Sequence, residues 1–228
     1  MRRTQGFTLV EIAIVLVIIG LLLGGILKGQ EMITQAKIKN VIADFSGISA
    51  AYHGYQDRYR AIPGDDPNAN TRWTTPTAAI QGNGDGVVSG TYNFACSNPG
   101  TTVGTNESCF WWDHLRRAGF VSGTGTSQPF NAVTGLIGVQ TGNGATPPGA
   151  ALAPAGGGGF VSLIVCSANL PDKIAIAADT QMDDGDSRAG TVRGQIHTAG
   201  PNPGINAATD ANNYAENGTN VYTICRAL

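Results

Sequence analysis

Four aspartates in the carboxyl-terminal half could form one negatively charged site: Asp179, Asp183, Asp184 and Asp186. The first two are four residues apart in a segment with helical spacing, and the others follow at its carboxyl end, where the helix dipole disfavours negative charge. A positive group is therefore expected beside them. A calcium ion, which takes about six to eight oxygen ligands, is one candidate. Ion pairs with Arg188 and Arg193 are the other, and they are favoured.

A second possible calcium loop is the stretch QGNGDGVV, in which Asn83, Asp85 and Gly86 match part of the calcium-loop pattern. The pattern calls for an acid where Gln81 stands and for a closing glutamate where Tyr92 stands. A turn is therefore the favoured interpretation of this stretch, with calcium as the alternative.

Catalytic chemistry has little support in the sequence. The histidines are His53, His114 and His197, and none has the spacing of a metalloprotease or of a nucleophile elbow. A formal net charge of −2 gives no indication of a nucleic-acid-binding surface. We therefore expect a protein that is not an enzyme and does not bind nucleic acid.

One glutamate interrupts an otherwise apolar run near the amino terminus. Residues Phe7 to Leu27 form a stretch of 21 residues, about the length that a helix needs to span hydrocarbon, and Glu11 is its only charge. A carboxylate in lipid costs about 2.5 to 3.5 kcal/mol, so such residues are kept for a function. The alternative is that Glu11 reaches the headgroups from the helix end.

The residues before the run differ from an ordinary secretory signal. Arg2 and Arg3 form a basic leader, but the apolar run is too long, and the small residue Gly6 lies before it. Cleavage after Gly6 would remove both arginines and leave the apolar helix on the mature protein. The arginines also favour a cytoplasmic amino terminus, which puts the carboxyl end across the membrane.

The stretch Gly6-Phe7-Thr8-Leu9-Val10-Glu11 resembles the leader junction of type IV prepilins, the precursors of type IV pilins and of type II secretion pseudopilins. The resemblance implies cleavage after Gly6 by a prepilin peptidase, methylation of the new amino terminus at Phe7, and a role for Glu11 in filament assembly. It departs at Lys28, where many pilins and major pseudopilins have a proline. Related major pseudopilins bind calcium in their heads, which by analogy supports both candidate calcium sites.

The cysteines all lie beyond the apolar run, and they are Cys96, Cys109, Cys166 and Cys225. An even number of cysteines in an exported domain predicts two disulfides. Three connectivities are possible. We favour Cys96 with Cys109, which closes a local loop, and Cys166 with Cys225, which ties the carboxyl end to a predicted strand.

Helical spacing continues beyond the apolar run. One apolar stripe at steps of three and four contains Ile38, Val41, Ile42, Phe45, Ile48, Tyr52, Tyr55 and Tyr59, and the turn from Pro63 to Pro67 ends it. Further on, 108–120 and 171–185 are expected to be helical, and 160–167, 191–197 and 220–225 to be strands. These elements predict an α+β fold: a long amino-terminal helix packed on a small antiparallel sheet with long loops, as the resemblance also implies.

Three regions follow: a cleaved leader, 1–6; a helix, 7–60, whose residues 7–27 cross the membrane and drive assembly; and a periplasmic or extracellular head, 61–228. We expect a structural filament subunit, first held in inner-membrane lipid and then assembled with its own copies, other pilin-like subunits and an inner-membrane platform. A pseudopilin of type II secretion is favoured. A major or minor surface pilin for adhesion, motility or DNA uptake is the alternative, and a monomeric membrane-anchored binding module is the alternative of another class.

Overall fold

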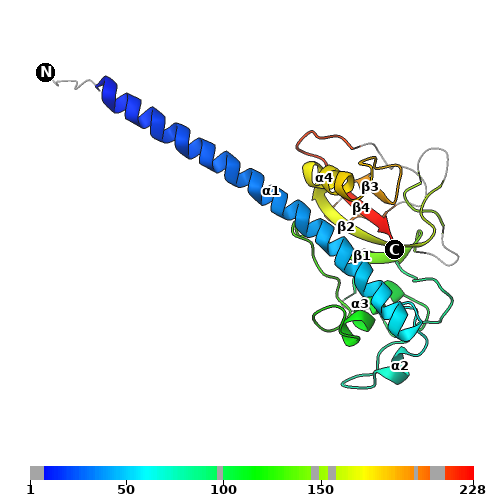
Figure 1. Ribbon diagram of the computed structural model, residues 1–228. Helices are drawn as coiled ribbons and strands as arrows, with labels where there is room; N and C mark the ends of the chain where they lie inside the picture. The colour runs from blue at the N-terminus through cyan, green and yellow to red at the C-terminus, as the bar shows by residue number, and fades with distance from the viewer. Residues whose placement is uncertain (1–7, 97–99, 145–148, 154–157, 198–199, 206–213) are drawn as a thin grey trace. The chain divides into compact units, whose positions relative to one another are not determined.

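The computed structural model describes residues 8–96, 100–144, 149–153, 158–197, 200–205 and 214–228. Its elements in chain order are α1 (Leu9–Tyr59), α2 (Ala69–Arg72), α3 (Glu107–Arg117), β1 (Ile137–Thr141), β2 (Leu163–Pro171), α4 (Asp172–Met182), β3 (Val192–Ile196) and β4 (Val221–Ala227). A long apolar helix is thus followed by a small antiparallel sheet, which confirms the predicted α+β, pilin-like architecture (Figure 1).

The chain divides into an amino-terminal unit, Met1–Lys37, and a carboxyl-terminal unit, Ile38–Leu228. Helix α1 begins in the first unit and continues into the second without a break in its helical conformation. The amino-terminal unit therefore consists, in its described part, of helix preceded by Thr8. The core and the sheet belong to the carboxyl-terminal unit.

The second half of α1 buries the predicted apolar stripe. Its buried residues are Ile38, Val41, Phe45, Ile48, Ala51, Tyr52 and Tyr55. They join the main core, to which Ile137 and Val139 of β1 and Val165 of β2 also contribute. The helix ends at Tyr59, just before the Pro63-Gly64 turn that was expected to stop it. The stripe prediction is confirmed.

The sheet has the order β1-β2-β4-β3, and all neighbouring strands are antiparallel. Strand β2 is central and is buried on both faces: Val165 points into the main core, while Ile164 and Cys166 belong to a second core with Tyr92. This explains why β2 lacks the polar and apolar alternation of a half-exposed strand. Helices α1, α3 and α4 contribute to the main core, and loop residues such as Leu152 cover the opposite face.

Two strands differ most from the expectations: β2 has other bounds, and β1 lies outside the expected strands. The strand expected over 160–167 is β2, which begins at Leu163 and extends to Pro171, because its carboxyl-terminal part pairs with β4 beyond an irregularity between Ser167 and Leu170. Strand β1 carries no clear strand pattern, since it has a glycine at position 138. A Cβ atom on Gly138 would lie 2.0 Å from the carbonyl oxygen of Tyr92, so the glycine permits the close approach of a neighbouring loop.

Candidate functional site

The first turn of α1 is closed by a reciprocal pair of hydrogen bonds between Thr8 and Glu11. The Thr8 backbone N–H and hydroxyl both donate to Oε2 of Glu11, at 2.8 Å each, and the Glu11 backbone N–H donates to the Thr8 hydroxyl at 3.3 Å. Thr8 precedes the helix and Glu11 is its third residue, which is the arrangement of a capping box. The sequence contains this Thr-x-x-Glu signal, and our reading of Glu11 as a charge in lipid missed it.

The rest of this segment exposes apolar side chains. The exposed large apolar residues of α1 are Leu9, Val10, Ile12, Ile14, Val15, Leu16, Val17, Ile18, Ile19, Leu21, Leu22, Leu23, Ile26, Leu27, Met32 and Ile33. By length and composition the helix could cross a membrane, and none of its most apolar 18-residue window is buried within this chain. An apolar surface of this extent marks a contact with lipid or with other protein chains.

The predicted cleavage and methylation sites, Gly6 and Phe7, lie outside the described residues. The sequence around them matches a family model: residues 1–27 fit the model described as the prokaryotic N-terminal methylation motif. No curated protein and no solved structure matches the chain.

This match supports a prepilin of the type IV pilin and pseudopilin class. The motif implies processing by a prepilin peptidase and assembly with other pilin subunits. Together with the apolar first half of α1, it fits a protein anchored in a membrane.

The predicted acidic site after α4 is only partly formed. Oxygen atoms of Asp179, Asp183 and Asp184 lie within 4.8 Å of one another, and Asp186 is not part of this group. Asp179 is fully buried on α4, where its Oδ2 accepts the hydroxyl of Tyr214 at 2.6 Å. Burial raises the pKa of Asp179 to about 6, against the opposing effect of the Tyr214 hydrogen bond.

Neither predicted arginine neutralises this group. Among the described residues Arg188 pairs with Asp186 alone, with Nε 3.4 Å from Oδ1, and both side chains are partly exposed. Arg193 is directly opposite Cys225 in the β3–β4 pairing, so its side chain lies on the second-core face of the sheet. There it donates to the carbonyl of Gly158 at 2.6 Å and lies over the ring of Phe160. The expectation of ion pairs from both arginines is therefore wrong for Arg193 and holds for Arg188 only at Asp186.

Backbone amides take the place of the arginines. The Val192 backbone N–H donates to Oδ2 of Asp183 at 2.9 Å, and the Thr191 N–H donates to the same oxygen. The Gly185 N–H donates to Oδ1 of Asp179 at 3.3 Å. The start of β3 and the loop after α4 are thus held together by carboxylates that accept from the chain itself.

A second acidic group forms where the sequence favoured a turn and left calcium binding as the alternative. Asp85 stands in that turn, and its carboxylate lies within 4.8 Å of those of Asp65 and Glu107. Asp65 accepts the N–H groups of Gly84 and Gly86, at 2.6 and 2.8 Å. Burial raises the pKa of Asp65, and the charge of Asp85 raises it further.

Glu107 completes this second group from the first residue of α3. It is fully buried, and its two oxygens accept the backbone N–H groups of Asn83 and Ser89, at 3.1 Å each. Burial raises the pKa of the Glu107 carboxyl group. Sequence reasoning missed Asp65 and Glu107. The available signal was the pair of acids flanking a Gly- and Asn-rich loop in a chain with few charges.

Both acidic groups have the hard oxygen ligands that calcium prefers. In both, however, the buried carboxylates already accept hydrogen bonds from backbone N–H groups, so the fold of these loops has a sufficient explanation without a cation. The loop from Asn83 is the turn that the sequence favoured: the Asp85 N–H donates to Oδ1 of Asn83 at 3.1 Å. Calcium binding at Asp179, Asp183 and Asp184 stays a prediction.

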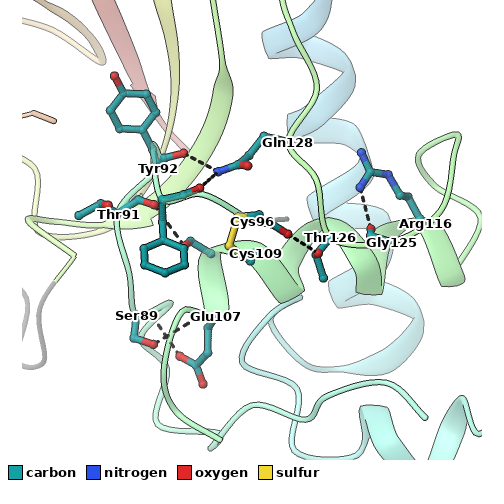
Figure 2. Close-up of a disulfide and its surroundings, with 12 residues drawn as sticks. Ser89, Thr91, Tyr92, Cys96, Glu107, Cys109, Arg116, Gly125, Thr126 and Gln128 are labelled. Atoms are coloured by element: carbon teal, nitrogen blue, oxygen red, sulfur yellow. Dashed lines mark hydrogen bonds between the residues drawn. A yellow bond between two sulfur atoms is a disulfide. The ribbon is translucent and has the colours of Figure 1, made fainter. Parts of the chain in front are cut away.

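Two disulfides hold the loops of the carboxyl-terminal unit, and they join the pairs that we favoured. Cys96 is bonded to Cys109 in α3, as Figure 2 shows, and the hydroxyl of Thr126 donates to the Cys96 carbonyl at 2.6 Å. Cys166 is bonded to Cys225 between directly opposite positions of β2 and β4. The second bond fixes the last strand to the centre of the sheet.

Proposed function

We propose that this protein is a structural, non-catalytic subunit of a type IV pilus-like filament, and specifically a pseudopilin of a type II secretion system. The observation that carries the proposal is Glu11, the only charge between Leu9 and Leu27, in the first turn of a helix whose apolar residues are exposed. A lone membrane protein gains only the cap with Thr8, which an uncharged glutamine could also make. A filament subunit gains a partner for a charged amino terminus.

The Glu11 carboxylate of one subunit can pair with the amino terminus of the next. Cleavage after Gly6 creates a positive amine on Phe7, and both the amine and the Glu11 carboxylate then lie at the edge of hydrocarbon or within it, where isolated charges are costly. Both hydrogen bonds that the described residues give to this carboxylate end on Oε2. Oε1 is therefore available to accept the amine of an incoming subunit. The apolar helices supply attraction, and the charge pair sets the axial register.

The proposed location follows from the leader and the disulfides. Arg2 and Arg3 keep the amino terminus cytoplasmic. The carboxyl-terminal unit then folds in the periplasm, an oxidising compartment in which disulfides such as Cys166–Cys225 persist. The choice of a pseudopilin over a surface pilin rests on the two carboxylate groups, through the analogy with the calcium-binding heads of major pseudopilins.

Two single substitutions separate the charge of Glu11 from its capping role. Glu11→Gln retains a side-chain oxygen that can accept from Thr8, since glutamine also serves in a capping box, but it removes the charge. Thr8→Ala removes the hydroxyl that makes two of the three cap bonds and keeps the charge. We expect Glu11→Gln to insert and to be cleaved normally, and to assemble at least about 100-fold less, because breaking a buried pair costs about 3 to 5 kcal/mol.

Loss of the cap alone should be milder, at about 0.5 to 2 kcal/mol of helix stability, and Thr8→Ala should assemble at close to the wild-type level. The measurement is sheared filament from cells that carry each variant as the only copy, at equal membrane level, with cleavage checked by intact mass. Wild-type amounts of filament from Glu11→Gln would refute the charge pairing. Equal losses from the two variants would show that the cap is what assembly requires.

Deletion of the gene tests the choice between secretion and surface fibres. A pseudopilin predicts that exported proteins accumulate in the periplasm and that wild-type protein, supplied from a plasmid, restores their release. Normal secretion together with loss of surface fibres would replace the pseudopilin by a surface pilin. The result for Glu11→Gln would still decide whether the chain is a filament subunit.

A further inference from the structure

A cavity of about 360 Å³ lies beside the carboxyl end of α3, and none of its lining residues belongs to either acidic group. Its walls come from three separate stretches of the carboxyl-terminal unit: the loop after α2, with Trp73 and Pro76; the last turns of α3, with Arg116 and Arg117; and the loop at 123–125. Its volume is within the range of small-molecule sites. The proposed filament function assigns no role to this cavity.

Two guanidinium groups give the cavity a positive character. Arg117 is paired, since its Nε donates to Oδ2 of Asp113 at 2.6 Å. Arg116 has no carboxylate within 4.0 Å among the described residues; its Nη1 instead donates to the Gly125 carbonyl at 2.7 Å (Figure 2). The lining therefore contains two positive charges and one negative charge. Arg116 is also half-buried, and burial lowers the pKa of its guanidinium.

The guanidinium of Arg116 retains donors for a ligand. Arginine carries five N–H donors in a planar fork. The protein uses Nε, toward the Ser122 carbonyl at 3.4 Å, and one N–H of Nη1, toward Gly125. The remaining N–H groups can donate in pairs to a planar carboxylate, which is the arrangement that gives arginine its strongest hydrogen bonds.

The other walls combine rings with hydroxyl groups. Trp73 and Pro76 supply flat apolar surface. The threonines at positions 75, 77 and 124 line the same cavity, and none of their hydroxyls is hydrogen-bonded to a described residue. A ligand that uses all of these groups has a ring, several hydroxyls and one negative charge. A purely apolar acid would make no hydrogen bonds with these hydroxyls.

We propose that this cavity binds one carboxylate-bearing sugar ring, with the carboxylate on the Arg116 guanidinium and the ring over the indole of Trp73. Acidic polysaccharide at a cell surface or in a secreted matrix would present such rings. An inorganic anion would satisfy Arg116 alone and would make no use of Trp73.

Titration calorimetry on the full-length protein tests the proposal, in a zwitterionic detergent so that no sugar headgroup competes. The probes are glucuronate, galacturonate and N-acetylneuraminate, with glucose as the neutral match and sulfate as the anion without a ring. We expect saturable binding of at least one acidic sugar. Glucose and sulfate should each bind at least about 10-fold more weakly, as expected when a charged hydrogen bond or the ring contact is lost.

Matched variants locate the site. Arg116→Gln should weaken binding of the acidic sugar at least about 10-fold, and Arg188→Gln, at an exposed arginine that is paired with Asp186, should leave it unchanged. Tryptophan fluorescence checks that each variant is folded. If Arg116→Gln unfolds, two other measurements replace it. Trp73→Leu should weaken binding of the acidic sugar, and a higher sodium chloride concentration should weaken its binding to the wild-type protein.

The proposal would be overturned if none of the three acidic sugars bound at about 50 mM, or if sulfate bound as tightly as they do, which would reduce the cavity to a general anion site. Unchanged affinity in a folded Arg116→Gln protein would also overturn it, because the carboxylate would then bind elsewhere.

Discussion

Replacing His114 with glutamine should make the stability of the carboxyl-terminal unit less dependent on pH. His114 is fully buried in α3. Its Nδ1 accepts the backbone N–H of Gly64 at 2.9 Å, and its Nε2 lies 2.8 Å from the carbonyl oxygen of Ile80. Because Nδ1 must accept and Nε2 must donate, the ring is neutral. It clamps the loop after α1 and the loop before Asn83 to α3.

The sign of the effect follows from the pKa. Burial lowers the pKa of His114 below its usual value, against the opposing hydrogen bond to Ile80 and the charge of Asp113. Between the folded and unfolded pKa values the unfolded chain binds a proton that the folded chain excludes, so stability from this group is complete above a pH of about 6.5 and is lost as the pH falls. The loss is at most about 1.4 kcal/mol per pH unit, or about 2 kcal/mol at pH 5.

A second contribution to the stability lost in His114→Gln does not depend on pH. Without the imidazole, the Gly64 N–H and the Ile80 carbonyl lose their buried partner, at about 1 to 3 kcal/mol for each group left unsatisfied. Gly64 also packs closely against the start of α3, since a Cβ atom there would lie 2.6 Å from the Glu107 carbonyl oxygen. His114→Gln should therefore be less stable than wild type at pH 7.5, and the gap should narrow toward pH 5.

The assay is thermal unfolding of full-length protein in detergent, followed by the fluorescence of Trp73, Trp111 and Trp112, at a series of pH values. The difference in stability between variant and wild type at each pH cancels the contribution of carboxyl groups that titrate in the same range and leaves that of His114. His53→Gln is the matched control, since His53 is exposed on α1 and its replacement should leave the wild-type profile unchanged. A difference between His114→Gln and wild type that stays constant from pH 7.5 to pH 5 would refute a neutral buried clamp.

The contribution of Asp179 to stability should depend on pH in the opposite sense to that of His114, and Asp179→Asn tests this. The folded pKa of Asp179 is about 6 and the unfolded value is about 3.9, so the folded chain binds the extra proton, and the wild-type contribution weakens as the pH rises from about 4 through 6. In the presence of a chelator, the variant should gain about 1 to 3 kcal/mol at pH 7.5 and nothing at pH 4, and a loss at pH 7.5 would contradict the result expected from burial. Replacing Cys166 and Cys225 together should cost about 1 kcal/mol more than replacing Cys96 and Cys109, because their separations in sequence are 59 and 13 residues, and calorimetry showing the reverse order would contradict the loop-entropy argument.

Features encoded by short-range periodicity were predictable from the sequence. The stripe of α1 repeats every three to four residues, so its buried face from Ile38 to Tyr55 could be assigned before any fold was known. The end of α4 was also predictable, because Gly185, a glycine with φ of +77°, follows shortly after the last helical residue. In these segments the local pattern and the tertiary packing favour the same structure.

Contacts between distant segments were not predictable in the same way. Asp65 and Glu107 are 42 residues apart, and the loop that joins their carboxylates runs between them, so no local pattern indicates that they meet. Arg193 shows the related difficulty. It is near the acidic group in sequence, but alternation along β3 turns its side chain to the opposite face of the sheet. Sequence proximity is a poor guide to ion pairs once a strand begins.

Glu11 combines a local and a long-range role, and the structure makes these compatible. The cap with Thr8 uses Oε2, and it organises the first turn in a single chain before any partner is present. That turn holds the carboxylate at a fixed position on the helix, which reduces the conformational entropy that a later pairing would have to overcome. A free glutamate side chain would meet an incoming amine in many geometries and set no register. The cap therefore orders the Glu11 carboxylate before it pairs. Thr8→Ala should lower the rate of assembly, because the pairing then costs more conformational entropy, and should leave the final amount of filament close to the wild-type level.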